Sequence, residues 1–234
     1  ADSRANVAIV ILTYNEELNL PQALASACGW AREVFVLDSH SRDGTEAVAR
    51  GFDCQLFHHR FKNYSDQRNH ALTALPITAE WVLFLDADEW LTEELKQEIT
   101  RLLKRRFIWL GRWIKRGYYP TWILRLFRHG KGRCEDREVN EHIIVEGPVG
   151  YLEHDFVHQD RKDVGEWVAK HNSYAEREAR ELLKLDNAVR QEEIEARFWG
   201  SQAERKRWIR NRVWNGLPPL LRPFLFYAYR YVIR

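Results

Sequence analysis

Short apolar runs alternate with helix-like patterns through the first hundred residues. Apolar residues fill positions 7–12, 34–37 and 81–85, which predicts three buried strands over 7–12, 33–37 and 81–85, and a weaker strand is predicted over 54–57. Helical spacing or helix-start signals follow these runs, and they predict helices over 19–28, 45–50 and 64–75 and after Thr92. Strands that alternate with helices indicate an α/β fold around a mostly parallel sheet.

The pattern changes after residue 103, where basic and aromatic residues follow one another without a defined strand period. Apolar residues recur at helical spacing over 164–185, and a second amphipathic helix fits 193–214. We therefore expect an α/β domain over 1–160 and a helical C-terminal extension over 161–234.

Charge is balanced overall but not along the chain. The 234 residues carry 36 Lys and Arg against 34 Asp and Glu, and the net charge of +2 gives no general reason to expect a polyanion. Residues 101–133 and 205–234 hold many cations and no acid. No recognised nucleic-acid-binding module accompanies them, so we expect no nucleic-acid partner.

Three cysteines, at positions 28, 54 and 134, form neither an even disulfide framework nor a metal-binding pair. The first apolar run is too short to span a membrane and lacks a basic flank and a cleavage signal. Both observations favour a cytoplasmic location.

Polar clusters follow three of the predicted strands. They occupy residues 13–16, 38–39 and 86–89. Because ligands of open parallel sheets bind outside the carboxyl ends of the strands, we expect these clusters to share one site.

Asp86 and Asp88 are the most informative pair in these clusters. A buried apolar strand delivers both carboxylates to one place, where their repulsion favours a hard cation such as Mg²⁺ or Mn²⁺ that also binds a substrate diphosphate. The alternative is a solvated turn with a helix-capping Asp. In the other clusters, Asp38 has the chemistry to accept from a nucleobase N–H and Thr13 or Asn15 to bond a ribose, although both clusters also suit simple turns.

Four segments together resemble a known family. VAIVILTYNEE, EVFVLDSHSRDGT, KNYSDQRNHAL and EWVLFLDADEW are similar, in order and approximate spacing, to the inverting glycosyltransferases of family two. The resemblance implies a Rossmann-like, nucleotide-sugar-binding fold of the GT-A type, a UDP-sugar donor, and a divalent metal at Asp86 and Asp88. It also implies a nucleotide site formed by Thr13, Tyr14, Asn15, Glu16, Asp38, Ser39, Gln67, Arg68, Asp86 and Ala87.

A downstream segment, YYPTWILRLFRHGKGRCEDREVNEHIIVEG, resembles the subgroup that contains the lipopolysaccharide core β-1,4-glucosyltransferases. This resemblance implies UDP-glucose as donor and a lipid-linked or cell-envelope glycan as acceptor. It also implies a peripheral position at the cytoplasmic face of the membrane.

Inverting transfer needs a carboxylate that takes the acceptor proton. Glu141 is the preferred candidate because it lies in the Asn-Glu-His element that the subgroup shares, with Asp136 as second choice and Glu135 as a further candidate. Salt bridges to nearby Arg residues are the alternative role for each.

His158, within DFVHQD, stands where related enzymes carry a histidine near the diphosphate, and it is a candidate metal or phosphate ligand. His154 lies four residues earlier, but no third and fourth ligand accompanies the pair, which argues against zinc.

The tail from residue 205 mixes aromatic rings with Arg, as in a helix that lies in a membrane interface, and a buried docking helix is the alternative. Two other functions stay open: a non-catalytic nucleotide-sugar-binding scaffold, and a sugar-nucleotide pyrophosphorylase, against which the missing Gly-rich phosphate loop argues. The oligomeric state does not follow from these patterns.

Overall fold

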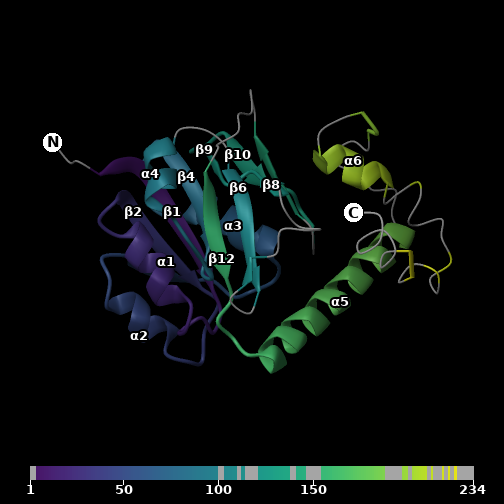
Figure 1. Cartoon of the computed structure of the whole chain (residues 1–234), viewed down its shortest axis with the longest axis horizontal. Coiled ribbons are helices and arrows are strands. Elements are labelled where there is room, and N and C mark those ends of the chain that lie inside the picture. Colours follow the sequence, from purple (N-terminus) through teal and green to yellow (C-terminus); the bar gives the residue numbers. More distant parts are fainter. Residues whose placement is uncertain are drawn as a thin grey trace.

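The chain is described by a computed structural model. It describes residues 4–99, 103–109, 112–113, 121–137, 141–145, 154–187, 197–199 and 202–209, and also residues 212, 218, 221, 224 and 225. An α/β body occupies most of the described chain, and a long helix leaves it after the last strand (Figure 1).

The central sheet has five strands in the order β3-β2-β1-β4-β9. Their bounds are Gln55–His58 (β3), Ala31–Asp38 (β2), Ala5–Thr13 (β1), Trp81–Asp86 (β4) and Leu126–Arg128 (β9). The first four are parallel, and β9 runs antiparallel to β4. The predicted strands at 7–12, 33–37, 54–57 and 81–85 are thereby confirmed.

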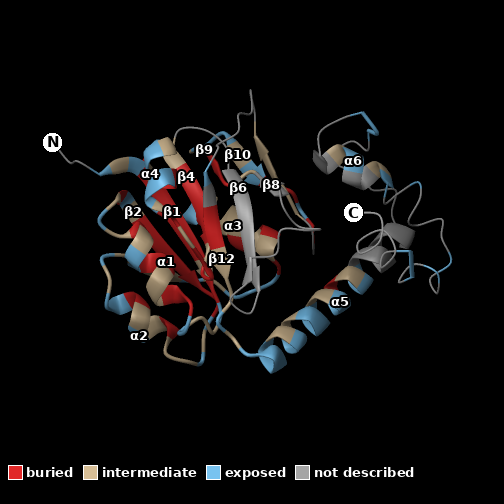
Figure 2. Cartoon of the chain, in the orientation of Figure 1, coloured by how far each residue is buried: buried red, intermediate tan, exposed pale blue. Residues whose placement is uncertain are grey.

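Both faces of β1 are covered, as its uninterrupted apolar run requires. Ile9 and Ile11 pack on one face with Leu24, while Ala8 and Val10 belong to the core on the other face. Figure 2 shows the resulting buried centre, with exposed residues on the outer surfaces of the helices. The flanking helices are α1 (Leu20–Ala27), α2 (Thr45–Arg50), α3 (Tyr64–Ala74) and α4 (Glu93–Glu98).

A second sheet is built from the region where the sequence predicted no strand. Its order is β5-β12-β6-β7, with bounds Glu89–Trp90 (β5), Asp155–Gln159 (β12), Leu103–Trp109 (β6) and Arg112–Trp113 (β7). The short strand β8 (Thr121–Ile123) pairs with β6, and β10 (Gly132–Cys134) forms a separate pair with β11 (Ile143–Val145). The antiparallel pairing of β12 with β5 places residues 155–159 beside the turn that follows β4.

Two further helices follow the sheets. α5 spans Val164–Asn187, close to its predicted bounds, and α6 spans Gln202–Ile209. The longer helix predicted over 193–214 is wrong at residues 197–199, which are not helical, and residues 193–196, 200–201, 210–211 and 213–214 lie outside the described chain. Among the described residues, no helix has the length and apolar character needed to cross a membrane.

Candidate functional site

The polar clusters that follow β1, β2 and β4 meet at one edge of the central sheet. Thr13 stands opposite Asp38 in the β1–β2 register, and Leu12 stands opposite Asp86 in the β1–β4 register. β2 and β3 lie on one side of β1, and β4 lies on the other side, so the order in which the chain adds strands switches between β1 and β4. Open α/β sheets bind their ligands at such a switch point.

Asp38 anchors the loop that follows β2. Its Oδ1 accepts a hydrogen bond from the Thr13 hydroxyl at 2.8 Å, and its Oδ2 accepts one from the Ser41 backbone N–H at 2.7 Å. The side chain is fully buried. In this structure Asp38 therefore holds the β1 and β2 loops together, and a direct bond to a nucleobase stays a prediction.

The loop after β1 is fixed by the loop after β2. The backbone N–H groups of Asn15 and Glu16 donate to the hydroxyls of Ser41 (2.8 Å) and Thr45 (2.7 Å). Asn15 adopts a left-handed conformation with φ 54°, which Asn tolerates better than most residues. Tyr14 is left half exposed at the rim.

Gln67 joins α3 to this edge. Its side-chain amide donates to the Ser39 hydroxyl at 3.1 Å and to the His59 carbonyl at 2.9 Å. Its buried Oε1 accepts no hydrogen bond from the described residues. Four of the predicted nucleotide-site residues are thus brought into one hydrogen-bonded group: Thr13, Asp38, Ser39 and Gln67.

Arg125 organises the acidic turn after β4. It donates to both carboxylate oxygens of Asp86, at 3.0 and 2.7 Å, and its Nη2 lies 3.4 Å from Glu89 Oε1. Burial opposes its charge, but the neighbouring carboxylates outweigh that effect and raise the pKa of Arg125. Asp86 is therefore held by a permanent cation, while Ala87 beside it is buried.

Asp88, Glu89 and His158 offer two carboxylate oxygens and one imidazole nitrogen within 4.8 Å of one another. His158 Nδ1 lies 3.1 Å from Asp88 Oδ1 and 3.5 Å from Glu89 Oε1. The β12–β5 register sets His158 opposite Glu89, and Gln159 N–H donates to the Asp88 carbonyl at 2.8 Å. This oxygen-rich set fits Mg²⁺ or Mn²⁺.

The predicted metal ligands divide in this arrangement. Asp88 and His158 come together as expected, and Glu89 joins them, although the sequence did not single it out. Asp86 is instead engaged by Arg125. Burial alone raises the pKa of Asp88, but His158 and Lys170 outweigh burial and lower it, so Asp88 is ionised as a metal ligand must be.

A second candidate set consists of Asp38, Glu46 and His58. His58 Nε2 lies 2.9 Å from Glu46 Oε1, and both oxygens of Asp38 already accept from Thr13 and Ser41. The set after β4 is the better metal site.

Two lysines from the chain after β12 reach the acidic groups of the site. Lys162 Nζ lies 2.6 Å from Glu16 Oε1, and Lys170 Nζ lies 3.8 Å from Asp88 Oδ2 and 3.6 Å from Asp160 Oδ2. Burial opposes the charge of Lys170, but Asp88 outweighs it and raises the pKa of Lys170, which stays protonated. Sequence reasoning missed both lysines because the contacts span 146 and 82 residues of chain.

The candidate bases lie in different surroundings. Glu141 accepts a hydrogen bond from Arg68, whose Nη2 is 3.8 Å from Asp86 Oδ1. Asp136 is exposed, and Glu135 is buried with a carboxylate oxygen 3.6 Å from His142 Nδ1. Glu141 is joined to the acidic turn through a chain of ion pairs, by way of Arg68.

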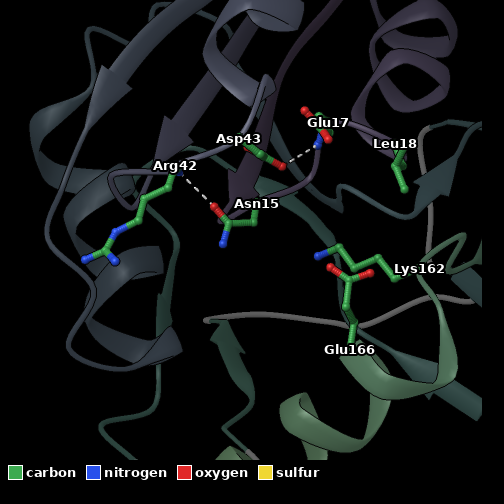
Figure 3. A pocket seen from close by; sticks show the side chains of 7 residues that line it. All are labelled: Asn15, Glu17, Leu18, Arg42, Asp43, Lys162 and Glu166. Carbon is green, nitrogen blue, oxygen red and sulfur yellow. Dashed lines mark hydrogen bonds between the residues drawn. The ribbon is translucent and has the colours of Figure 1, made fainter.

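A cavity of about 240 Å³ lies between the loops that follow β1 and β2 and the segment that leads into α5. Figure 3 shows Asn15 and Glu17 on one side and Lys162 and Glu166, from the start of α5 and the segment before it, on the other. Leu18, Arg42 and Asp43 complete its lining. The cavity is thus walled by the β1 and β2 loops and by the C-terminal segment.

Comparison with known proteins places this fold and site in a family. Residues 8–148 match the profile of Glycosyl transferase family 2, which is more than half of the chain. The chain belongs to glycosyl transferase family 2. The predicted family and enzyme class are confirmed, whereas the lipopolysaccharide-core subgroup is not established by the match.

A structural neighbour supports the GT-A fold of this family-2 domain. S. aureus TarS 1–349 in complex with UDP-GlcNAc aligns with a TM-score of 0.51 at 16% identity, covering 67% of this chain and 59% of that one. The agreement confirms the predicted fold class.

Curated relatives match part of the chain. A TPR repeat-containing protein of Synechococcus elongatus is 34% identical over 131 residues, covering 53% of this chain and 32% of that protein. An uncharacterized glycosyltransferase of Rickettsia bellii is 33% identical over 93 residues, covering 40% and 31%. The chain therefore spans about a third of the length of these relatives.

Proposed function

We propose that this family-2 domain transfers a sugar from a UDP-sugar to a hydroxyl group of an acceptor, with inversion at the anomeric carbon and with the help of a divalent metal. The observation that carries the proposal is the grouping of Asp88, Glu89 and His158 beside the loops that follow β1 and β2. The family membership and the UDP-GlcNAc complex of S. aureus TarS support a nucleotide-sugar donor.

The donor would bind at the carboxyl edge of the central sheet. The Thr13–Asp38 pair and the Asn15 backbone fix the loops that would face the uridine, and a cavity lies between these loops and Lys162. Asp88, Glu89 and His158 would hold Mg²⁺ or Mn²⁺, which would supply Lewis-acid neutralisation of the departing diphosphate.

Glu141 is the proposed general base. In a single displacement the acceptor hydroxyl attacks the anomeric carbon from the face opposite the diphosphate, the C–O bond to UDP breaks, and Glu141 takes the hydroxyl proton. Such help is worth roughly 10²- to 10⁴-fold in rate. Arg68 orients Glu141 and lies near Asp86, so one side chain links the base to the turn that carries the metal ligands.

UDP-glucose is the proposed donor, and a lipid-linked or cell-envelope glycan such as lipopolysaccharide core is the proposed acceptor. The support is the resemblance of residues 118–147 to the β-1,4-glucosyltransferase subgroup. A peripheral position at the cytoplasmic membrane face and the division into a 1–160 catalytic domain and a 161–234 extension belong to the same proposal.

The test is calorimetric titration of UDP with Mn²⁺ and again with EDTA. We expect UDP binding that depends on metal. Asp88→Asn should weaken the UDP affinity in Mn²⁺ by more than roughly 10- to 100-fold, which is the loss typical of a residue that only supports a metal ligand. Asp53→Asn is the matched control, because Asp53 is an exposed carboxylate that lies 3.5 Å from Arg4, away from the acidic turn.

Turnover separates the enzyme from the scaffold. UDP release from UDP-glucose, by transfer or by slow hydrolysis, is expected for the wild type and is expected to fall about 100-fold or more in Glu141→Gln. Absence of UDP binding with and without metal contradicts the proposal, and metal-dependent binding without any UDP release favours the scaffold alternative.

A further inference from the structure

The C-terminal segment brings a fixed positive charge to the proposed metal ligand Asp88. Lys170 lies on α5, which comes after the family-matched residues 8–148 in the sequence. Its Nζ is nevertheless 3.8 Å from Asp88 Oδ2. Its side chain is a third exposed, so it lies at the edge of the site rather than in a closed core.

Asp160 holds the ammonium from the other side. Lys170 Nζ is 3.6 Å from Asp160 Oδ2, while Asp160 Oδ1 accepts hydrogen bonds from Asn19 Nδ2 at 3.0 Å and from the Lys162 backbone N–H at 3.1 Å. Asp160 is thus fixed to the start of α1, and Lys170 bridges a fixed carboxylate and a proposed metal ligand.

α5 is also docked further along the same face, independently of Lys170. Tyr174, one turn on, lies with its hydroxyl 3.3 Å from the hydroxyl of Tyr64 on α3. Buried Arg177, another turn on, packs over the rings of Phe61, Tyr64 and Tyr174, at 4.9 to 5.4 Å from their centroids. Residues 170, 174 and 177 share one helix face, so the position of Lys170 is set by the docking of the whole helix.

We propose that the Lys170 ammonium supplies the positive charge beside Asp88 when no nucleotide is bound. When the metal ion binds, the ammonium moves from Asp88 to the donor diphosphate. A lysine is suited to this exchange because its ammonium is compact and its stem flexible. Two cations so close to one carboxylate repel each other, so entry of the metal alone is opposed. A diphosphate offers the displaced ammonium a new anionic partner.

The inference rests on the proposed function and adds a regulatory consequence to it. Metal alone binds weakly, and metal binds well together with UDP, so Lys170 makes the metal site depend on the nucleotide. Lys170 is a positioning residue in the free enzyme and a diphosphate ligand in the loaded one.

The test measures Mn²⁺ binding to the full chain without nucleotide, by the loss of the free-ion electron paramagnetic resonance signal. We expect Lys170→Met to bind Mn²⁺ alone at least about 10-fold more tightly than the wild type. We also expect its affinity for UDP in saturating Mn²⁺ to fall. Lys170→Arg, which keeps the charge, is expected to bind Mn²⁺ alone as weakly as the wild type.

Arg180→Met is the matched control, since Arg180 is an exposed cation on α5 whose partner Glu176 lies four residues away on the same helix. It removes one positive charge from the same element without touching the acidic turn, and its Mn²⁺ affinity is expected to equal that of the wild type. Circular dichroism of each variant checks that α5 is retained, and Lys170→Gln provides a second neutral replacement.

An unchanged or weaker Mn²⁺ affinity in folded Lys170→Met and Lys170→Gln overturns the inference. If the wild type still binds UDP in a metal-dependent way, only the role of Lys170 is wrong. If the wild type binds neither Mn²⁺ nor UDP, both the inference and the proposed function are wrong.

Discussion

Arg125 shows how one buried side chain can define an acidic turn. It is 5% exposed, forms two hydrogen bonds with Asp86 and contacts Glu89, and its guanidinium lies 5.8 Å from the ring centroid of Phe156 on β12. Bidentate binding fixes the plane of the Asp86 carboxylate. Asp88 is thereby left to face His158, and Glu89 Oε1 lies between Arg125 and His158.

Arg125→Met is expected to lower the free energy of unfolding by roughly 3–5 kcal/mol, because it leaves buried carboxylates without their cation. Urea denaturation at pH 7 measures the change. Arg128→Met is the control: Arg128 is exposed on the same β9 strand and lies 3.7 Å from Glu80, so its loss should cost less than about 1 kcal/mol. Equal losses in the two variants would show that Arg125 is not essential to the turn.

Residue types at the ends of predicted strands were sufficient to identify much of the site. Thr13, Asp38, Asp86 and Asp88 follow apolar runs whose termini coincide at the edge of a parallel sheet. The sequence could not single out Glu89 as a candidate ligand or Lys170 as a neighbour of Asp88. Their proximity depends on the β12–β5 pairing and on the docking of α5, and neither leaves a periodic signal.

At the scale of elements, Glu33 connects β2 to the segment that leads into β4. Its carboxylate accepts from the backbone N–H groups of Thr78, at 3.0 Å, and Ala79, at 3.1 Å. Burial raises its pKa, but the hydrogen bonds from Thr78 and Ala79 outweigh burial, so the pKa of Glu33 is lowered overall. The bond helps to align the strands that flank β1.

Glu33→Gln is expected to be less stable than the wild type by roughly 1 kcal/mol at pH 7, a modest value because Glu33 is partly exposed. A lowered pKa means that the contribution is fully present above the unfolded value of about 4.3 and is lost as pH falls through the folded value. Denaturation at pH 7, 5 and 3 should therefore show the two proteins converging at pH 3. A constant difference across this range would contradict the assignment to ionised Glu33.

Elements of the first hundred residues could be predicted because each has a long apolar run or a helix period of its own. α1, α3 and β4 follow their predicted bounds within one residue. The strands β7 to β11 contain two or three residues each, which is too short for a recognisable period. Their partners, and not their own residues, determine that they are strands.

At the scale of the whole molecule, the C-terminal part exposes large apolar side chains beside cations. The exposed apolar residues are Phe198, Trp199, Ile209, Leu221, Phe224 and Leu225. Arg205 and Arg212 are exposed in the same part of the chain. Rings with cations suit attachment to an anionic membrane surface.

Removal of residues 205–234 is expected to weaken binding to vesicles that contain anionic lipid, by about 10-fold or more if several Arg contacts are lost. Co-sedimentation measures the vesicle binding, and vesicles of neutral lipid show how much of it depends on lipid charge. The UDP affinity in Mn²⁺ should stay unchanged. Vesicle binding that is insensitive to the deletion would refute a membrane role for the tail.

The position of β12 has a consequence for engineering. The family match ends at residue 148, whereas His158, Lys162 and Lys170 lie beyond it and contact the acidic groups at the sheet edge. The family-matched residues 8–148 and the segment that follows them therefore both contribute side chains to the candidate site. A chimera that keeps residues 8–148 and takes about forty following residues from another family member would keep Asp88 and Glu89 but replace His158 and Lys170, so we expect both its metal affinity and the dependence of metal binding on nucleotide to change.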